Sequence, residues 1–209
     1  TYTGEDLQVS QIKTTGGAAT SLISNAGEAD RWGGEIEISL VPIEDLLLRL
    51  GYSYINGDYD KLPETCGTNI PVTCLESEKF ALRSQSPSNQ LNFSAEYVFA
   101  RTSIGDISGF LQVNWQDEWA ETVLWTGVVG GEPVIYPFQG MDERTLVDAR
   151  LSLENIPVGD KSKLRVSLWG KNLTDNDYPT FSINFGGLGL ITEQYGEPRT
   201  YGLEVSYDF

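Results

Sequence analysis

The sequence predicts an all-β fold, in which about eight antiparallel strands form a transmembrane β-barrel with short turns and long loops. Three observations support this prediction. Apolar and polar residues alternate along most of the chain, as on strands that expose two different faces. The alternating segments run to roughly ten residues, which suits a tilted strand crossing a bilayer better than a soluble strand of about five or six. The links between them differ in length in the way that outer-membrane barrels require.

Eight segments carry the alternation, and in each of them every second residue is apolar, so that one face of the strand is apolar. The final segment is the clearest and the first is the weakest. In chain order, the apolar positions are Leu7 and Val9; Ile36, Ile38 and Leu40; Leu46, Leu48, Leu50, Tyr52 and Tyr54; Leu91, Phe93, Ala95 and Tyr97; Leu111, Val113 and Trp115; Val147, Ala149, Leu151 and Leu153; Leu164, Val166 and Leu168; and Tyr201, Leu203, Val205, Tyr207 and Phe209.

The opposite face of the same segments is polar and carries charges in mid-strand. In a wet or polar barrel interior such charges cost little free energy. The charged positions are Glu35, Glu37, Arg49, Arg150, Arg165 and Glu204.

Short and long links alternate along the chain. The short ones are residues 41–45, 101–106 and 155–163, and the long ones are residues 13–29, 59–88, 118–143 and 175–197. Outer-membrane barrels have short periplasmic turns and longer extracellular loops. The last strand is therefore expected to end on the periplasmic side of a bacterial outer membrane.

Aromatic residues gather at both ends of the predicted strands, where rings with a polar tip favour the two lipid–water interfaces. Near the long links these are Tyr52, Tyr54, Trp115 and Tyr201, and near the short turns Tyr97, Phe99, Tyr207 and Phe209. This placement predicts two aromatic girdles.

Composition narrows the function. Lys and Arg total 14 against 30 Asp and Glu, which gives a formal net charge of -16, and the chain has no histidine. A nucleic-acid partner is excluded, because no basic stripe is present to neutralise phosphates. Without histidine, a Ser-His-Asp triad and the commonest metal ligand are both missing. We expect a protein that is not an enzyme and that holds neither a metal nor a cofactor.

The two cysteines, Cys66 and Cys74, lie in the segment LPETCGTNIPVTCLESE, inside one long link. Two cysteines without histidine make a poor zinc site. We expect a local disulfide within this loop, which implies an oxidising compartment; two unrelated reduced cysteines are the alternative.

Two further expectations concern membrane insertion and export. No run of about eighteen apolar residues is present, which excludes a transmembrane helix. The chain opens at Thr1 without a basic and apolar leader, so we expect a secretory signal to be cleaved or to lie upstream.

Two long links are rich in aromatic residues, which on loops often stack on a ligand or a partner. The alternative is that they pack each loop against its neighbours. The candidate ligand-binding residues are Trp119, Trp125, Tyr136 and Phe138 in one link and Tyr178 and Tyr195 in the last.

The C-terminal segments WGKNLTDNDYPTF and GEPRTYGLEVSYDF resemble the end of TonB-dependent outer-membrane receptors. In that family an Asn-Leu-Thr-Asp segment commonly follows the penultimate strand, here Asn172 to Asp175, and the last strand ends in an aromatic residue, here Phe209. The segment RWGGEIEISLVPIEDLLLRLGYSYINGDYD is similar to a family hairpin. The resemblance covers nearly all of the chain.

The resemblance implies that residues 1–209 are the C-terminal part of a barrel of about 22 strands around a plug. The plug and the TonB box would lie upstream. The implied function is active uptake of a scarce nutrient, namely a ferric siderophore, cobalamin or an oligosaccharide. The implied partners are lipid, lipopolysaccharide, the TonB complex, the plug or an accessory surface lipoprotein, and the barrel-assembly machinery. That machinery would read Tyr201, Leu203, Val205, Tyr207 and Phe209.

Two alternatives remain open at the level of sequence. The first is a complete eight-stranded outer-membrane barrel with a structural or passive role, whose interior is filled by side chains. The second is a secreted soluble β-protein that binds carbohydrate through its aromatic loops.

Overall fold

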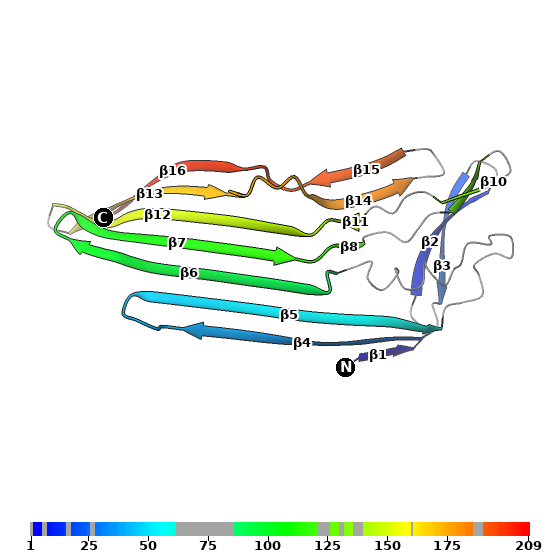
Figure 1. The fold of residues 1–209 in the computed structure, drawn as a ribbon. Coiled ribbons are helices and arrows are strands. Elements are labelled where there is room, and N and C mark those ends of the chain that lie inside the picture. Colours follow the sequence, from blue (N-terminus) through cyan, green and yellow to red (C-terminus); the bar gives the residue numbers. More distant parts are fainter. Residues whose placement is uncertain are drawn as a thin grey trace.

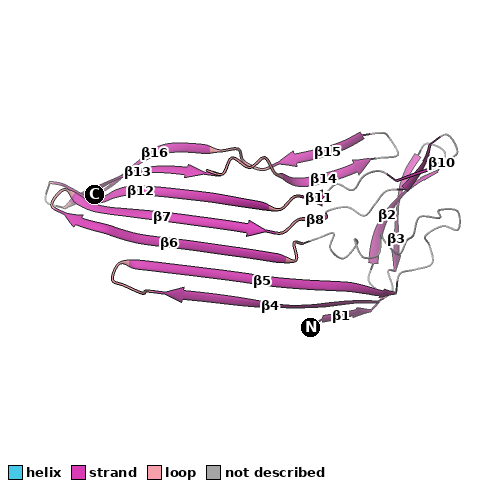
Figure 2. Cartoon of the chain, in the orientation of Figure 1, coloured by secondary structure: helices cyan, strands magenta, loops and turns pink. Residues whose placement is uncertain are grey.

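The computed structural model describes residues 2–5, 8–15, 18–25, 28–61, 86–120, 126–129, 132–135, 140–159, 161–185 and 190–209. These residues form strands and connecting segments, with no helix among them (Figure 2). No helix long and apolar enough to cross a membrane is found in the described ranges. The two cysteines, Cys66 and Cys74, fall outside them, so their pairing stays a prediction.

Eight strands form one antiparallel sheet in the order β1-β4-β5-β6-β7-β12-β13-β16 (Figure 1). β1 and β16 lie at its two edges and do not pair with each other, so the described sheet is open. Apart from β1, its strands are 9 to 16 residues long, which confirms the predicted membrane-spanning length. The bounds are β1 Tyr2–Glu5, β4 Glu28–Leu40, β5 Leu46–Lys61, β6 Asn89–Thr102, β7 Gly105–Gln116, β12 Arg144–Val158, β13 Ser162–Lys171 and β16 Thr200–Asp208.

Short turns and long links lie at opposite ends of this sheet, as the sequence predicted. Figure 1 shows the three short turns and the C-terminus at one end, and the long links at the other. Four two-stranded ladders lie within the long links. They are β2 Gln8–Thr15 with β3 Ala18–Asn25, β8 Trp119–Ala120 with β11 Gly140–Met141, β9 Thr126–Val129 with β10 Glu132–Ile135, and β14 Pro179–Phe185 with β15 Leu190–Tyr195.

The prediction for the first strand was wrong. Val9 belongs to β2, which pairs only with β3, and the strand that joins the sheet is β1, before it in the chain. Alternation misleads here because a hairpin that extends beyond the sheet has the same period of two as a strand within it.

The predicted short link 155–163 is also longer than the turn that forms. β12 continues to Val158, and a β-bulge between Leu153 and Ile156 accommodates Asn155 at a positive φ of 53°. The Asn-Ile-Pro segment thus bends the strand instead of ending it, because a bulge absorbs one extra residue.

Polar and apolar side chains are distributed as in a membrane protein. Among the described residues the buried apolar side chains are Met141 and Pro87, whereas the buried polar residues are Ser152, Ser167, Asn172 and Ser182. Large apolar side chains are exposed on one face of the sheet; on β16 the exposed fractions are 81% for Tyr201, 63% for Leu203 and 59% for Val205. A soluble domain does not leave a patch of this extent in water, so this apolar face requires a covering such as lipid.

Cross-strand register keeps the two faces separate from β4 to β16. On the apolar face, one row pairs Leu50 with Phe93, and another pairs Leu151 with Leu168 and Leu168 with Leu203. Each polar-face position likewise pairs with a polar-face position of the next strand. A register slip of one residue would move every side chain of a strand to the opposite face, and no such slip occurs between these strands. The sheet therefore has one continuous apolar face and one continuous polar face.

Candidate functional site

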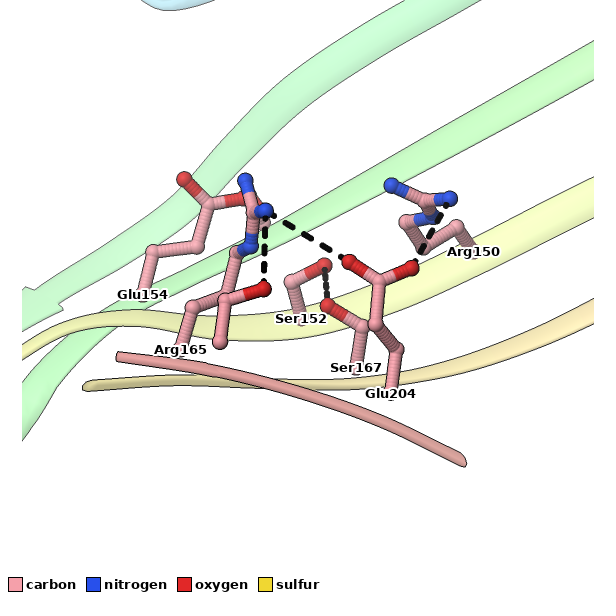
Figure 3. A network of polar contacts seen from close by, with 8 residues as sticks. Arg150, Ser152, Glu154, Arg165, Ser167 and Glu204 are labelled. Carbon is pink, nitrogen blue, oxygen red and sulfur yellow. Dashed lines mark hydrogen bonds and ion pairs between the residues drawn. The ribbon is translucent and has the colours of Figure 1, made fainter. Parts of the chain in front are cut away.

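An ion-pair network crosses the last three strands on the polar face (Figure 3). The carboxylate of Glu204 on β16 accepts contacts from two guanidinium groups, Arg150 on β12 at 3.5 Å and Arg165 on β13 at 3.4 Å. Arg165 also donates to the hydroxyl of Ser206 at 3.2 Å. Arg150 and Arg165 are thus both paired with the same carboxylate.

Two hydroxyl contacts lie beside this network. Ser152 and Ser167 share a hydrogen bond of 2.8 Å, and both side chains are buried. Ser108 donates to the carboxylate of Glu154 at 2.8 Å. These contacts connect β7, β12, β13 and β16 through side chains, in addition to the backbone ladder.

Nearer the long links, the polar face is hollowed into a groove of about 640 Å³. Register sets its lining, because Glu35, Ser53, Gln90, Gln116 and Arg144 are successive cross-strand partners on β4, β5, β6, β7 and β12. The next row toward the short turns holds Glu37, Gly51, Asn92, Asn114 and Leu146. The groove therefore lies on the polar face of five neighbouring strands, with Leu146 as an apolar member of its second row.

Most of the predicted aromatic residues lie toward the ends of their strands, but Tyr52 and Tyr54 lie in the middle of β5, which continues to Lys61. Tyr52 donates its hydroxyl proton to Asn89, and at the long-link end of β7 the indole N–H of Trp115 donates to Glu143 at 2.7 Å. At the short-turn end, Tyr97 and Phe99 meet edge to face with ring centroids 5.0 Å apart. Rings whose polar tips reach hydrogen-bond partners at the end of the apolar face suit a membrane interface.

The turn of residues 172–176, here called the Asn172 turn, anchors the last long link to the sheet. The Asn172 side chain donates to the backbone carbonyls of Asn176 at 2.9 Å and Glu197 at 3.2 Å, and its backbone N–H donates to Asp148 at 2.9 Å. Asn172 is buried and has a φ of 49°, a conformation that asparagine tolerates better than most residues.

Among the predicted ligand-binding residues, Tyr178 and Tyr195 lie close together at the base of β14 and β15. The backbone N–H of Gly196 donates to the carbonyl of Tyr178 at 2.9 Å, and the Arg144 guanidinium lies 4.5 Å from the centre of the Tyr178 ring. Tyr195 is exposed, and its hydroxyl donates to Glu193 at 2.8 Å, which raises the pKa of Tyr195.

Trp119 is not part of this group. Trp119 lies on β8, which pairs with β11 in a separate ladder. Trp125, Tyr136 and Phe138 fall outside the described residues. Their role in ligand binding therefore remains a prediction.

Sequence reasoning missed Arg144 and the amides Gln90, Asn92, Asn114 and Gln116 as one site. Each of these residues was visible only as a polar position of its own strand. The signal that unites them is strand register, which alternation along single strands does not supply.

No family model matches the chain, and no curated protein sequence does either. Solved structures do. The ferric yersiniabactin uptake receptor FyuA of Yersinia pestis matches 99% of this chain with a TM-score of 0.63 and 17% identity. The ferric preacinetobactin receptor BauA of Acinetobacter baumannii matches 97% with a TM-score of 0.60 and 21% identity.

A third structure is the ferripyoverdine receptor of the outer membrane of Pseudomonas aeruginosa, which matches 98% of this chain with a TM-score of 0.58 and 18% identity. This is the fold of an outer-membrane receptor wall. At these identities the likeness establishes the receptor-wall fold alone. The chain spans 26%, 26% and 23% of the length of FyuA, BauA and the ferripyoverdine receptor.

Proposed function

We propose that the chain is the C-terminal part of the barrel wall of a TonB-dependent receptor, which takes up a scarce nutrient across the bacterial outer membrane. The observation that carries the proposal is the reversed burial of the sheet. Its apolar side chains are exposed on one continuous face, and its buried side chains are almost all polar. In a membrane barrel, lipid would cover the apolar face and the polar interior of the barrel would surround the polar face.

Three further observations support this reading. The receptor-wall fold extends over nearly the whole chain. Both sheet edges, β1 and β16, carry unpaired backbone groups that a membrane barrel would have to pair by closure. The ion pairs of Arg150 and Arg165 with Glu204 suit the interior of a barrel that holds a plug, because buried charges must be paired.

The proposal includes the orientation and the partners that the receptor family implies. The short turns and Phe209 face the periplasm, and the Asn172 turn and the groove face the outside of the cell. The exposed residues Tyr201, Leu203, Val205, Tyr207 and Phe209 form the side of β16 that the barrel-assembly machinery reads. The nutrient is a ferric siderophore, cobalamin or an oligosaccharide, and energy comes from the proton gradient through TonB.

Energised uptake tests this function. A strain that produces the protein would be supplied with iron-55 bound to each of a panel of siderophores, and with radiolabelled cobalamin and oligosaccharides. We expect accumulation of one of these that an uncoupler or loss of TonB abolishes. Accumulation that continues in both cases would support the passive barrel, and a protein that stays soluble without detergent would support the secreted carbohydrate-binding protein.

A further inference from the structure

The groove on the polar face carries opposite charges at its two ends. Glu35 lies on β4 and Arg144 on β12, at the ends of one cross-strand row that spans four strand spacings. At about 4.8 Å per spacing the two backbones are about 19 Å apart along the sheet. Glu37 lies one row below Glu35 on the same face, so the β4 end holds two carboxylates.

These charged groups have no ionic partner among the described residues. Neither Glu35 nor Glu37 makes an ion pair there, although Arg49 also lines the groove. Arg144 meets no carboxylate within the described chain. Its guanidinium lies over the Tyr178 ring and donates to the carbonyl of Pro179 at 3.4 Å. Stacking on an aromatic ring holds a guanidinium in place while its N–H groups stay available to an anion.

The middle of the groove is a ladder of amides. Asn92 donates to Asn114 across β6 and β7, and the side chains of Gln90 and Gln116 form no hydrogen bond with another described residue. Primary amides both donate and accept, so this ladder can pair with the N–H and C=O groups of a ligand. The volume of about 640 Å³ falls within the range of small-molecule sites.

We propose that this groove binds an elongated dipolar ligand that contains amide groups, with a cationic group at Glu35 and Glu37 and an anionic group at Arg144. The inference rests on the proposed receptor function and narrows the nutrient to this chemical class. A neutral oligosaccharide could pair with the amides but would leave the charges at both ends unpartnered. A purely anionic ligand would be repelled by the two carboxylates.

The test measures binding to the protein at the length that the cell makes, purified in detergent, so that transport and TonB are not involved. The probe is a six-residue peptide of alternating glycine and serine, which spans at most about 20 Å when extended. It is prepared with free ends, with an acetylated amino end, and with an amidated carboxyl end. Isothermal titration compares the three peptides on the wild-type protein and on variants.

On the wild-type protein, each capped peptide should bind about three- to five-fold more weakly than the free peptide, as expected for one partly exposed charge contact. Arg144→Gln should remove the effect of amidation and keep that of acetylation. The double variant Glu35→Gln/Glu37→Gln should remove the effect of acetylation and keep that of amidation. Lys163→Gln is the control, because it removes one positive charge, as Arg144→Gln does, but at the short-turn end of the sheet. It should keep both effects.

Three outcomes would overturn the proposal. They are no binding of any peptide to the wild-type protein, equal binding of all three, and an equal loss of all three in each groove variant with retained β-sheet circular dichroism. The last would assign the groove residues a purely structural role. This experiment measures binding without transport. The peptide could therefore bind in the groove even if no TonB-dependent uptake were detected, so the groove proposal and the uptake proposal can fail separately.

Discussion

The backbone N–H of Asn172, at the end of β13, donates to the carboxylate of Asp148 on β12 at 2.9 Å. The same turn reaches β12 again, because Asn176 donates its side-chain amide to the carbonyl of Thr145 at 2.7 Å, and Leu173 donates its backbone N–H to Val147 at 2.8 Å. The Asn172 turn thus fastens the last long link to a strand that is adjacent to β13 in the sheet.

Replacing Asn172 should loosen this link. Asn172→Gly keeps a residue that accepts the φ of 49° but removes the amide contacts to Asn176 and Glu197. We expect a loss of about 1–3 kcal/mol in the free energy of unfolding, the usual cost of leaving buried polar groups unpaired. Urea unfolding in lipid vesicles measures it, with limited proteolysis of the last link as a second readout.

Asn172→Ala is the matched comparison, because it loses the same contacts and also disfavours the positive φ. It should be less stable than Asn172→Gly. If both variants unfold with the wild-type midpoint, the turn does not anchor the link.

The packing of Trp169 over Gly202 predicts a glycine requirement on the polar face. A Cβ at Gly202 would lie 2.7 Å from Cζ2 of the indole, closer than van der Waals contact allows. Gly202→Ala should therefore displace the Trp169 ring and change its fluorescence maximum. Gly51→Ala is the control, since its Cβ would meet Asn92 at an ordinary 3.9 Å. An unchanged indole spectrum in Gly202→Ala would contradict the packing.

The ion pair between Asp45, in the turn before β5, and Arg101, near the end of β6, predicts a pH dependence. Its hydrogen bond and charge hold the pKa of the Asp45 carboxyl below its ordinary value. A lowered folded-state pKa adds stability that is complete above the unfolded-state pKa of about 3.9 and disappears as the pH falls through the folded-state value.

The stability difference between the wild type and Asp45→Asn should therefore be present at pH 7 and shrink below about pH 4. Asparagine tolerates the φ of 65° at this position, so the variant changes the charge without straining the turn. In an Arg101→Gln background, Asp45→Asn should no longer cause a pH-dependent change in stability, because the partner of the carboxylate is gone. Urea titrations at several pH values measure it, and a difference that is constant with pH would refute the linkage.

The two faces of β7 predict opposite responses to a new charge. Leu111 lies on the apolar face, and Gln112, the next residue, lies on the polar face and pairs with Asp148. Leu111→Arg should lower the free energy of unfolding in lipid by about 2–4 kcal/mol, as for a cation placed at the bilayer midplane. Gln112→Arg should change it by less than about 1 kcal/mol. Equal effects of the two substitutions would argue against lipid on the apolar face.

Alternation along single strands was enough to predict which residues face which way, from Ile36 in β4 to Phe209 after β16. The period of two is a local property, and the length of each link is also visible in the sequence. The same local signal could not separate β2 from the sheet, so the assignment of Val9 was wrong. Sequence alone did not indicate that Asn155 would extend β12 through a bulge.

Sites that depend on register or on long-range contacts were not predictable. Glu35 and Arg144 lie in one row only because four strand pairings between them keep their registers. Asn172 was recognised as part of a resemblance, but its contacts to Asp148 and Glu197 come from segments 24 and 25 residues away in the chain. The register between two strands depends on how their whole faces pack together. It therefore cannot be predicted from the sequence of one strand alone.

If these strands form part of the wall of a larger receptor, the native polypeptide is much longer than 209 residues, and its denatured mass is the decisive measurement. The chain of 23.1 kDa spans 26% of BauA and of FyuA. We expect a denatured mass about four times 23.1 kDa, because a receptor of similar length would include a plug and the preceding strands. A mass near 23.1 kDa would contradict it and would favour a small barrel or a split subunit.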